Sequence, residues 1–143
     1  MEEKFTENFT VEEMIKSQTA TRLGIDNFPD MEAFVSLGKL CDMVLQPVRS
    51  SLKTPVIVTS GYRCDMLNAI IGGAKGSQHT LGEAADFEVI GYTNREVYDW
   101  IKDNLEFDQL ILEHYNPEIP NSGWVHCSYV DEIHNRNQAF EVG

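Results

Sequence analysis

Two histidines and one aspartate form the set of residues in this chain that could carry out chemistry together. His79 and Asp86 stand seven residues apart in the segment 77–86, and His126 lies within the apolar, β-rich run 123–129. Two imidazoles and one carboxylate are enough protein ligands for a catalytic zinc ion, which keeps its fourth position open for water or substrate. This set makes the chain a candidate metallohydrolase.

Each of the three residues is a weak signal when it is taken alone. A single histidine is more often a surface residue or a hydrogen-bonded core residue than a metal ligand. Asp86 is more informative, because a carboxylate on a strand is disfavoured by β-propensity and is costly if it is buried without a partner. A bound cation would remove that cost. The alternative is that Asp86 lies beside Glu88 on an exposed strand face.

The length and the charge limit the class of protein. The chain has 143 residues, of which 42% are hydrophobic, so we expect residues 1–143 to form a single domain with its own core. Asp and Glu number 23 against 11 Lys and Arg, which gives a formal net charge of -12. A field of this sign repels phosphate backbones and argues against general nucleic-acid binding.

The cysteines and the N-terminal residues bear on where the protein is made. Cys41, Cys64 and Cys127 are odd in number and have no C-x-x-C spacing, so we expect small buried hydrophobic residues rather than a thiolate zinc site. Free thiols suit a reducing cytosol. Residues 1–6 show no secretory signal, and no stretch approaches the ~20 apolar residues of a membrane span. We therefore expect synthesis in the cytoplasm and no membrane partner.

Capping signals and helical periodicity are concentrated in the first half of the chain. Thr10-Val11-Glu12-Glu13 has the S/T-x-x-E form of a capping box, which begins a short helix. Apolar residues at helical spacing predict a main core helix, with Pro47 near its end as a source of a kink. The predicted helices span 11–17, 29–48, 66–71 and 94–104.

The second half of the chain favours strands. A β-branched run is stopped by Gly61, and a polar loop over 75–81 carries His79. The tail after Asp131 is mostly polar and is predicted to be irregular. Early helices and late antiparallel-type strands indicate an α+β fold, with the helices packed on a small, mostly antiparallel sheet. The predicted strands span 55–60, 84–90, 107–115 and 124–130.

The last two predicted strands are joined by a short loop that contains proline and glycine, so we expect a hairpin. A symmetric register pairs Tyr115 with Trp124 and places Glu113 directly across from His126. Directly opposed residues share a face, with Cβ atoms about 4.5–5.5 Å apart. Glu113 is therefore the predicted general base, although a slip of one residue would turn it to the other face.

Arg63 and Ser77 are the predicted substrate-binding residues. Arg63 follows the buried strand, and its guanidinium can bind a carboxylate or support a polarised carbonyl group. The alternative is a surface arginine that pairs with Asp65. Ser77 lies two residues before His79 and can either donate a hydrogen bond to substrate or stabilise its own loop.

Taken together, these segments resemble peptidase family M15, the zinc D-Ala-D-Ala carboxypeptidase family, and most closely its small phage-type branch. The likeness covers nearly the whole chain, and the combined order S-x-H-x6-D…W-V-H is specific, whereas any one piece is not. The segments that carry it are 60–63, 67–68, 72–73, 77–79, 82–86, 107–113 and 123–129, with 9–13 and 21–27 near the N-terminus.

The resemblance implies the mixed fold shared with the Hedgehog signalling domain, a zinc cofactor held by His79, Asp86 and His126, and catalytic and substrate-binding roles for Arg63, with Ser77 as a substrate contact. One feature departs from another branch of the family, whose catalytic glutamate lies three residues before the last histidine. Here that position is Gly123, so Glu113 is the matching acid in the phage-type pattern.

The first interpretation is therefore a zinc-dependent peptidase that cleaves peptidoglycan stem peptides, either as a D-Ala-D-Ala carboxypeptidase or as an endolysin-type endopeptidase. One alternative is a non-catalytic zinc-containing module that binds the cell wall or a protein partner. Another is a metal-free structural domain. The first interpretation also predicts a monomer that reaches the cell wall by a phage or prophage lysis route.

Overall fold

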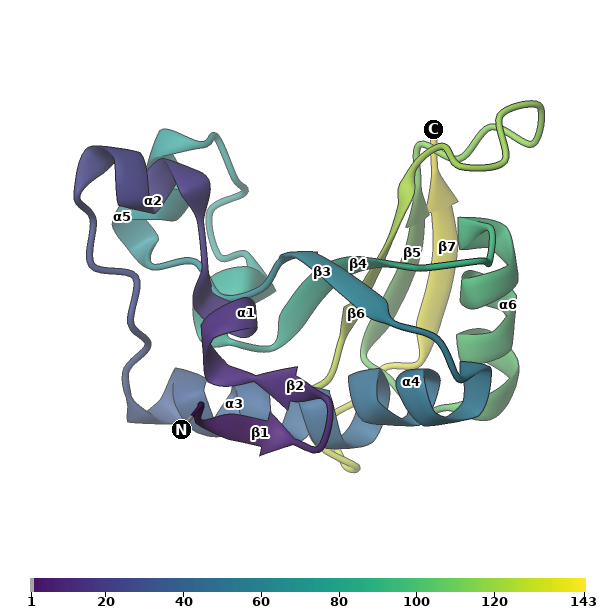
Figure 1. Cartoon of the computed structure of the whole chain (residues 1–143), viewed down its shortest axis with the longest axis horizontal. Helices are drawn as coiled ribbons and strands as arrows, with labels where there is room; N and C mark the ends of the chain where they lie inside the picture. Colours follow the sequence, from purple (N-terminus) through teal and green to yellow (C-terminus); the bar gives the residue numbers. More distant parts are fainter. Residues whose placement is uncertain (1) are drawn as a thin grey trace.

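Helices dominate the first half of the chain and strands the second, as expected for an α+β protein. The computed structural model describes residues 2–143. Its strands form a five-stranded sheet and a small two-stranded sheet (Figure 1). The strands are β1 (Lys4–Thr6), β2 (Phe9–Thr10), β3 (Val56–Ser60), β4 (Ala84–Val89), β5 (Gln109–Glu113), β6 (Trp124–Ser128) and β7 (Gln138–Val142).

The first helix begins at the predicted capping box. The Thr10 hydroxyl accepts from the Glu13 N–H at 3.1 Å, and the Glu13 carboxylate accepts from the Thr10 N–H at 2.7 Å. This helix ends at Ile15 rather than at residue 17, because Ser17 caps a separate, unpredicted helix. The helical segments are α1 (Val11–Ile15), α2 (Gln18–Leu23), α3 (Met31–Leu40), η1 (Cys41–Leu45), α4 (Gln46–Leu52), α5 (Asp65–Ile70), η2 (Gln78–Leu81) and α6 (Asn94–Asn104).

The predicted core helix is a continuous helical segment from Met31 to Leu52, which contains the wider π-helical turn η1. Within it the Gln46 N–H donates to the Cys41 carbonyl, five residues back. Pro47 follows directly, and its ring and missing N–H disrupt the regular α-helical hydrogen bonds of the preceding turn. The irregular turn therefore lies where the sequence predicted a kink.

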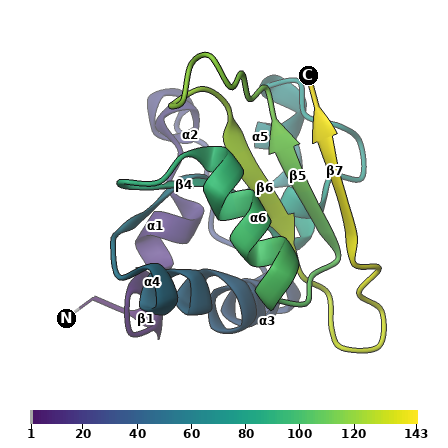
Figure 2. The same cartoon turned by 90° about the vertical axis from the view of Figure 1, so that its right-hand side faces the viewer.

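The five-stranded sheet has the order β3-β4-β6-β5-β7, with antiparallel pairs except for the parallel pair β5–β7. The prediction of an irregular tail is wrong for β7, which forms one edge of the sheet (Figure 2). The N–H groups of Asn137 and Gln138 donate to the carbonyls of Phe107 and Asp108, which starts β7 beside β5. Most β7 side chains are exposed, so the strand lacks the alternating pattern that would reveal it.

The two faces of the sheet differ in chemistry. In β4 the side chains of Ala85, Phe87 and Val89 are buried in the core, whereas Asp86 and Glu88 lie on the opposite face. The α3–η1–α4 segment and α6 cover the core face, and α2 and α5 stand at one end of the other face (Figures 1 and 2). Within residues 2–143, no helix combines the length and apolar character that crossing a bilayer requires.

Candidate metal centre

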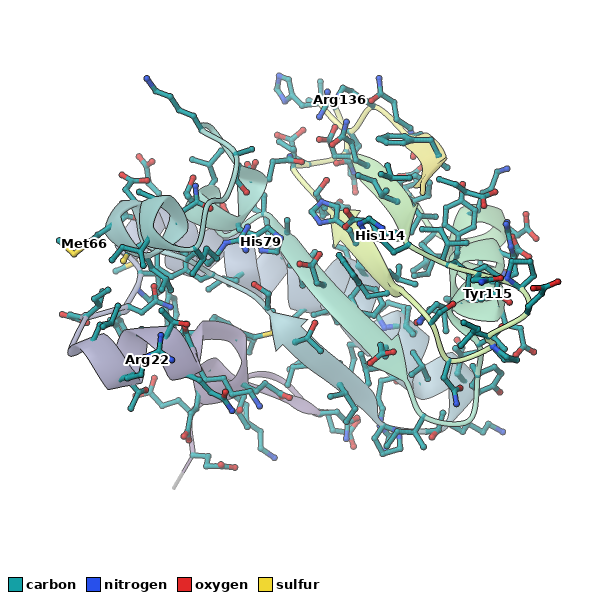
Figure 3. The ribbon with its side chains drawn as sticks, turned by 90° about the horizontal axis from the view of Figure 1, so that it is seen from above. Arg22, Met66, His79, His114, Tyr115 and Arg136 are labelled. Carbon is teal, nitrogen blue, oxygen red and sulfur yellow. The ribbon has the colours of Figure 1, made fainter. Side chains whose placement is uncertain are left out.

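The side chains of His79, Asp86 and His126 converge on the polar face of the sheet. His79 Nε2 lies 3.4 Å from Asp86 Oδ2, and His126 Nδ1 lies 2.9 Å from Asp86 Oδ1. One ligand atom from each residue lies within 4.8 Å of the other two. Figure 3 shows His79 near the middle of this face. The structure thus brings together the three residues that the sequence analysis singled out.

Strand pairing places two of the three side chains. In the β4–β6 ladder Asp86 pairs directly with His126. Directly paired residues project from the same face of the sheet, so the register alone brings the carboxylate next to the imidazole. The neighbouring pair, Ala85 with Cys127, points into the core and fixes this register by burial.

A backbone carbonyl orients the third ligand. His79 lies in the short helix η2 and is 3% exposed. Its Nδ1 lies 2.7 Å from the Gly61 carbonyl oxygen, so the ring donates its Nδ1–H there. Because Nδ1 is engaged by the Gly61 carbonyl, Nε2 is the ring nitrogen that can contact Asp86 or bind a cation. The role of Gly61 was not predicted from sequence, because a backbone carbonyl leaves no signal in the residue type.

Asp86 supplies the negative charge of the centre. Burial opposes ionisation of its carboxyl, but hydrogen bonds from His126 and His79 outweigh that effect and hold its pKa well below the usual range. The side chain is 16% exposed, so solvent reaches the centre only partly. An ionised, poorly solvated carboxylate between two imidazoles is the environment of a cation site.

The donor set fits zinc. Bonds of about 2.0–2.2 Å in a tetrahedral site place ligand atoms roughly 3.3 Å apart. The distances of 2.9 and 3.4 Å from Asp86 to the two histidines bracket this value. Two nitrogen ligands with one oxygen also match the preference of zinc. His79, Asp86 and His126 would hold the ion and leave its fourth position open.

Glu113 does not lie where the predicted register placed it. It pairs with Trp124, and Ile111 is the residue opposite His126. The prediction of direct opposition is therefore wrong by two residues. Because the displacement is even, Glu113 still projects from the face that carries His126, at a diagonal position, where residues lie about 7–8 Å apart and their Cβ atoms somewhat closer.

The loop between β5 and β6 explains this register. β5 ends at Glu113, and His114 adopts a left-handed φ of 54°. Gly123, with φ 72°, packs so closely that an added Cβ would lie 2.2 Å from the Glu113 carbonyl oxygen. The sequence analysis took Tyr115 as the last paired residue, whereas these two backbone turns end the pairing earlier.

Trp124 holds the carboxylate of Glu113. Its indole Nε1–H donates to Glu113 Oε2 at 2.9 Å. This bond fixes one oxygen of the carboxylate on the sheet face that carries His126, although Glu113 is not among the residues whose ligand atoms lie within 4.8 Å of one another. The pair was missed from sequence, because it depends on the observed register.

Arg63 turns toward the centre, and no ion pair with Asp65 forms within residues 2–143. Its backbone N–H donates to the His79 carbonyl at 3.1 Å, and its Nη2 lies 3.5 Å from Ser77 Oγ. Burial lowers the pKa of the guanidinium, while the charge of Asp86 raises it. Ser77 Oγ also accepts from the His79 N–H at 3.2 Å, so it stabilises its own loop.

A buried carboxylate that the sequence analysis did not single out supports the loop of His79. Asp108 is 2% exposed, and its Oδ2 accepts from Gln78 Nε2 at 2.9 Å and from Arg136 Nη2 at 2.7 Å. The hydrogen bond from Arg136 is the largest cause of its lowered pKa. Asp108 thus ties η2 to β5 and to the segment before β7. The cost of burying an unpaired carboxylate, applied here as it was to Asp86, could have identified it.

The remaining histidines lie outside the centre. His114 is exposed beside the ring of Trp124, with ring centroids 5.2 Å apart (Figure 3). His134 is exposed and pairs with Asp131 at 2.9 Å. The candidate metal centre therefore contains two of the four histidines in the chain.

Comparison with known proteins agrees with this geometry. The sequence profile of the family described as Peptidase M15 matches residues 7–128. This range contains β3, β4 and β6 and every residue of the metal centre. No curated protein matches the chain. The profile covers far more than half of the sequence, and on that basis the chain belongs to the Peptidase M15 family.

Proposed function

We propose that the protein is a zinc-dependent peptidase that hydrolyses peptide bonds in bacterial peptidoglycan stem peptides, as a D-Ala-D-Ala carboxypeptidase or as an endolysin-type endopeptidase. The observation that carries the proposal is the convergence of His79, Asp86 and His126 within 4.8 Å in a chain of the Peptidase M15 family. Arg63 lies beside these ligands, where a peptide that reaches the centre would meet its guanidinium.

Zinc, when bound, would act as a Lewis acid that polarises the scissile carbonyl and lowers the pKa of water to about 7. Glu113 accepts the proton of the attacking water and returns it to the leaving amine. The hydrogen bond from Trp124 keeps the carboxylate oriented for both transfers. Arg63 donates to the substrate oxygen on which negative charge develops, and Ser77 lies close enough to Arg63 to assist in binding.

Membership of the same family also supports a proposal for the domain organisation, the fold and the site of action. We propose that residues 1–143 form one zinc peptidase domain with the fold shared by D-Ala-D-Ala peptidases and the Hedgehog signalling domain. It acts as a monomer on the cell wall after synthesis in the cytoplasm, with a phage or prophage lysis route as its path to the wall. The formal charge of a zinc ion with one aspartate is +1, so the centre can receive an anionic peptide despite the net charge of -12.

Mass spectrometry of purified muropeptides tests the activity. The zinc-loaded protein is expected to release defined peptide fragments, and a chelator is expected to stop their release. Glu113→Gln should lower kcat about 10²- to 10⁴-fold while zinc stays bound, because it removes the general base. Glu118→Gln is a matched control, since Glu118 is exposed in the nearby loop. Stoichiometric zinc without turnover of any wall fragment would refute the peptidase and favour the non-catalytic module.

A further inference from the structure

A cleft of about 880 Å³ opens beside Arg63, between the α2 segment and β3. Most of residues 16–22 line one side of it, and Val58–Ser60 line the other. β3 is an edge strand of the five-stranded sheet. Figure 3 shows Arg22 on α2 at one end of the face that carries His79.

The charges that line this cleft are all positive, although the chain is strongly acidic. Lys16, Arg22 and Arg63 line it, and none of the lining residues within 2–143 is an aspartate or glutamate. The whole chain has 23 acidic residues against 11 Lys and Arg. A concave surface with charges of one sign concentrates ions of the opposite sign. Much of the remaining lining consists of residues whose hydroxyl groups can hydrogen-bond to a peptide: Ser17, Thr19, Thr21, Thr59 and Ser60.

The cleft is continuous with the metal centre through two residues. Ser60 lines the cleft and pairs with Asp86 across the β3–β4 ladder. Arg63 lines the cleft, and its backbone bonds the His79 carbonyl. Its guanidinium makes one long contact, 3.5 Å to Ser77, and its Nε has no partner within residues 2–143. Arg63 therefore retains donor capacity for a ligand that bridges the cleft and the centre.

We propose that this cleft binds an anionic segment of the substrate, and that Lys16 and Arg22 determine a preference for stem peptides whose glutamyl carboxylate is free. The inference rests on the proposed function for the identity of the substrate as a stem peptide. The binding itself depends on the cleft and its charges. Because both side chains are exposed, their attraction is also expected to weaken as salt screens it.

Binding to the zinc-free protein tests the cleft separately from catalysis. The probes are a fluorescent synthetic stem peptide with an internal glutamyl carboxylate and the same peptide with that carboxylate amidated. Fluorescence anisotropy at low salt should show about 5- to 10-fold tighter binding of the acidic peptide. The Lys16→Gln/Arg22→Gln double variant should bind both peptides equally. Lys53→Gln/Lys102→Gln makes the same charge change at exposed sites outside the cleft and should keep the preference.

The zinc-loaded proteins provide the second measurement. Wild type should show a higher kcat/KM for the acidic peptide, mainly through a lower KM, and the Lys16→Gln/Arg22→Gln variant should lose this difference while it still cleaves the amidated peptide. Thermal unfolding checks that both double variants are folded. A wild type without preference in binding, or a cleft variant that behaves as the control, would overturn the inference.

The two proposals fail in different ways. Preferential binding of the acidic peptide without hydrolysis of either peptide would refute the peptidase and support the cleft. Hydrolysis of both peptides at equal kcat/KM and with equal affinity would support the peptidase and refute the cleft.

Discussion

Gly61 connects the fold to the metal centre, and replacing it by alanine should damage both. An added Cβ at this position would lie 2.2 Å from the Met14 carbonyl oxygen, where ordinary contacts begin at 3.4 Å. The Tyr62 N–H donates to the same oxygen at 2.8 Å, so the two backbone segments cannot separate freely. The Gly61 carbonyl in turn accepts from His79 Nδ1 at 2.7 Å.

The expected loss of stability in Gly61→Ala follows from these contacts. The backbones must move apart by about 1 Å, and overpacking of this kind costs about 1–3 kcal/mol. For a domain of this size that lowers Tm by about 3–12 °C. Any displacement of the Gly61 carbonyl also weakens the bond that orients His79, and loss of such a partner reduces metal affinity by about 10- to 100-fold.

Thermal unfolding followed by circular dichroism, with and without zinc, measures the first effect, and zinc titration against a competing chelator measures the second. Gly38→Ala is the matched control, because its added Cβ meets only Phe5 Cδ1 at 3.6 Å and the position is helical. That variant should gain about 0.5–1 kcal/mol. If Gly61→Ala kept both the Tm and the zinc affinity of the wild type, our account of the His79 position would be wrong.

Three further predictions concern the candidate ligands, the ion pair of a buried aspartate and the cysteines. Asp86→Asn should reduce zinc affinity more than 100-fold, measured by calorimetry. This loss exceeds the 10- to 100-fold expected when a residue that only hydrogen-bonds to a ligand is removed. Arg136→Ala should lower the urea midpoint of unfolding at neutral pH, because it leaves the buried carboxylate of Asp108 without its guanidinium partner. The lowered pKa of Asp108 means that this stabilisation is present above the pKa of an unperturbed aspartate and is lost as the pH falls further, so the difference between the two midpoints should shrink below about pH 4. A thiol reagent should modify Cys64 alone in the native protein and three cysteines in denaturant, since the other two are buried and burial raises their pKa.

Local signals made much of this fold predictable. The capping box at Thr10 and the strand that carries Asp86 depend on residues close in sequence, and both occur where the pattern placed them. The same alternation that buries Ala85 and Phe87 puts Asp86 on the other face. Two of the conditions for a metal site, a polar face and a carboxylate on it, were therefore readable from periodicity alone.

The pairing between distant segments was not predictable in the same way. The position of Glu113 depends on where the hairpin stops pairing, which His114 and Gly123 decide through backbone angles that leave no hydrophobic pattern. β7 was missed because backbone hydrogen bonds and the ion pair of Arg136 with the buried Asp108 hold it, with little burial of its own side chains. Contacts of this kind become visible only when the register is known.

Strand pairing and a backbone hydrogen bond position the side chains of the candidate metal centre, and neither requires a metal. Asp86 and His126 face each other because of strand register, whereas a backbone carbonyl orients His79. Because the fold already imposes these constraints, a bound cation would not have to order the three side chains, and its affinity would not be reduced by that loss of entropy. The cleft beside Arg63 places further charges next to the centre, on residues that are not among its candidate ligands. If the cleft binds substrate as proposed, changes at Lys16 and Arg22 would alter substrate preference without disturbing the three ligand side chains.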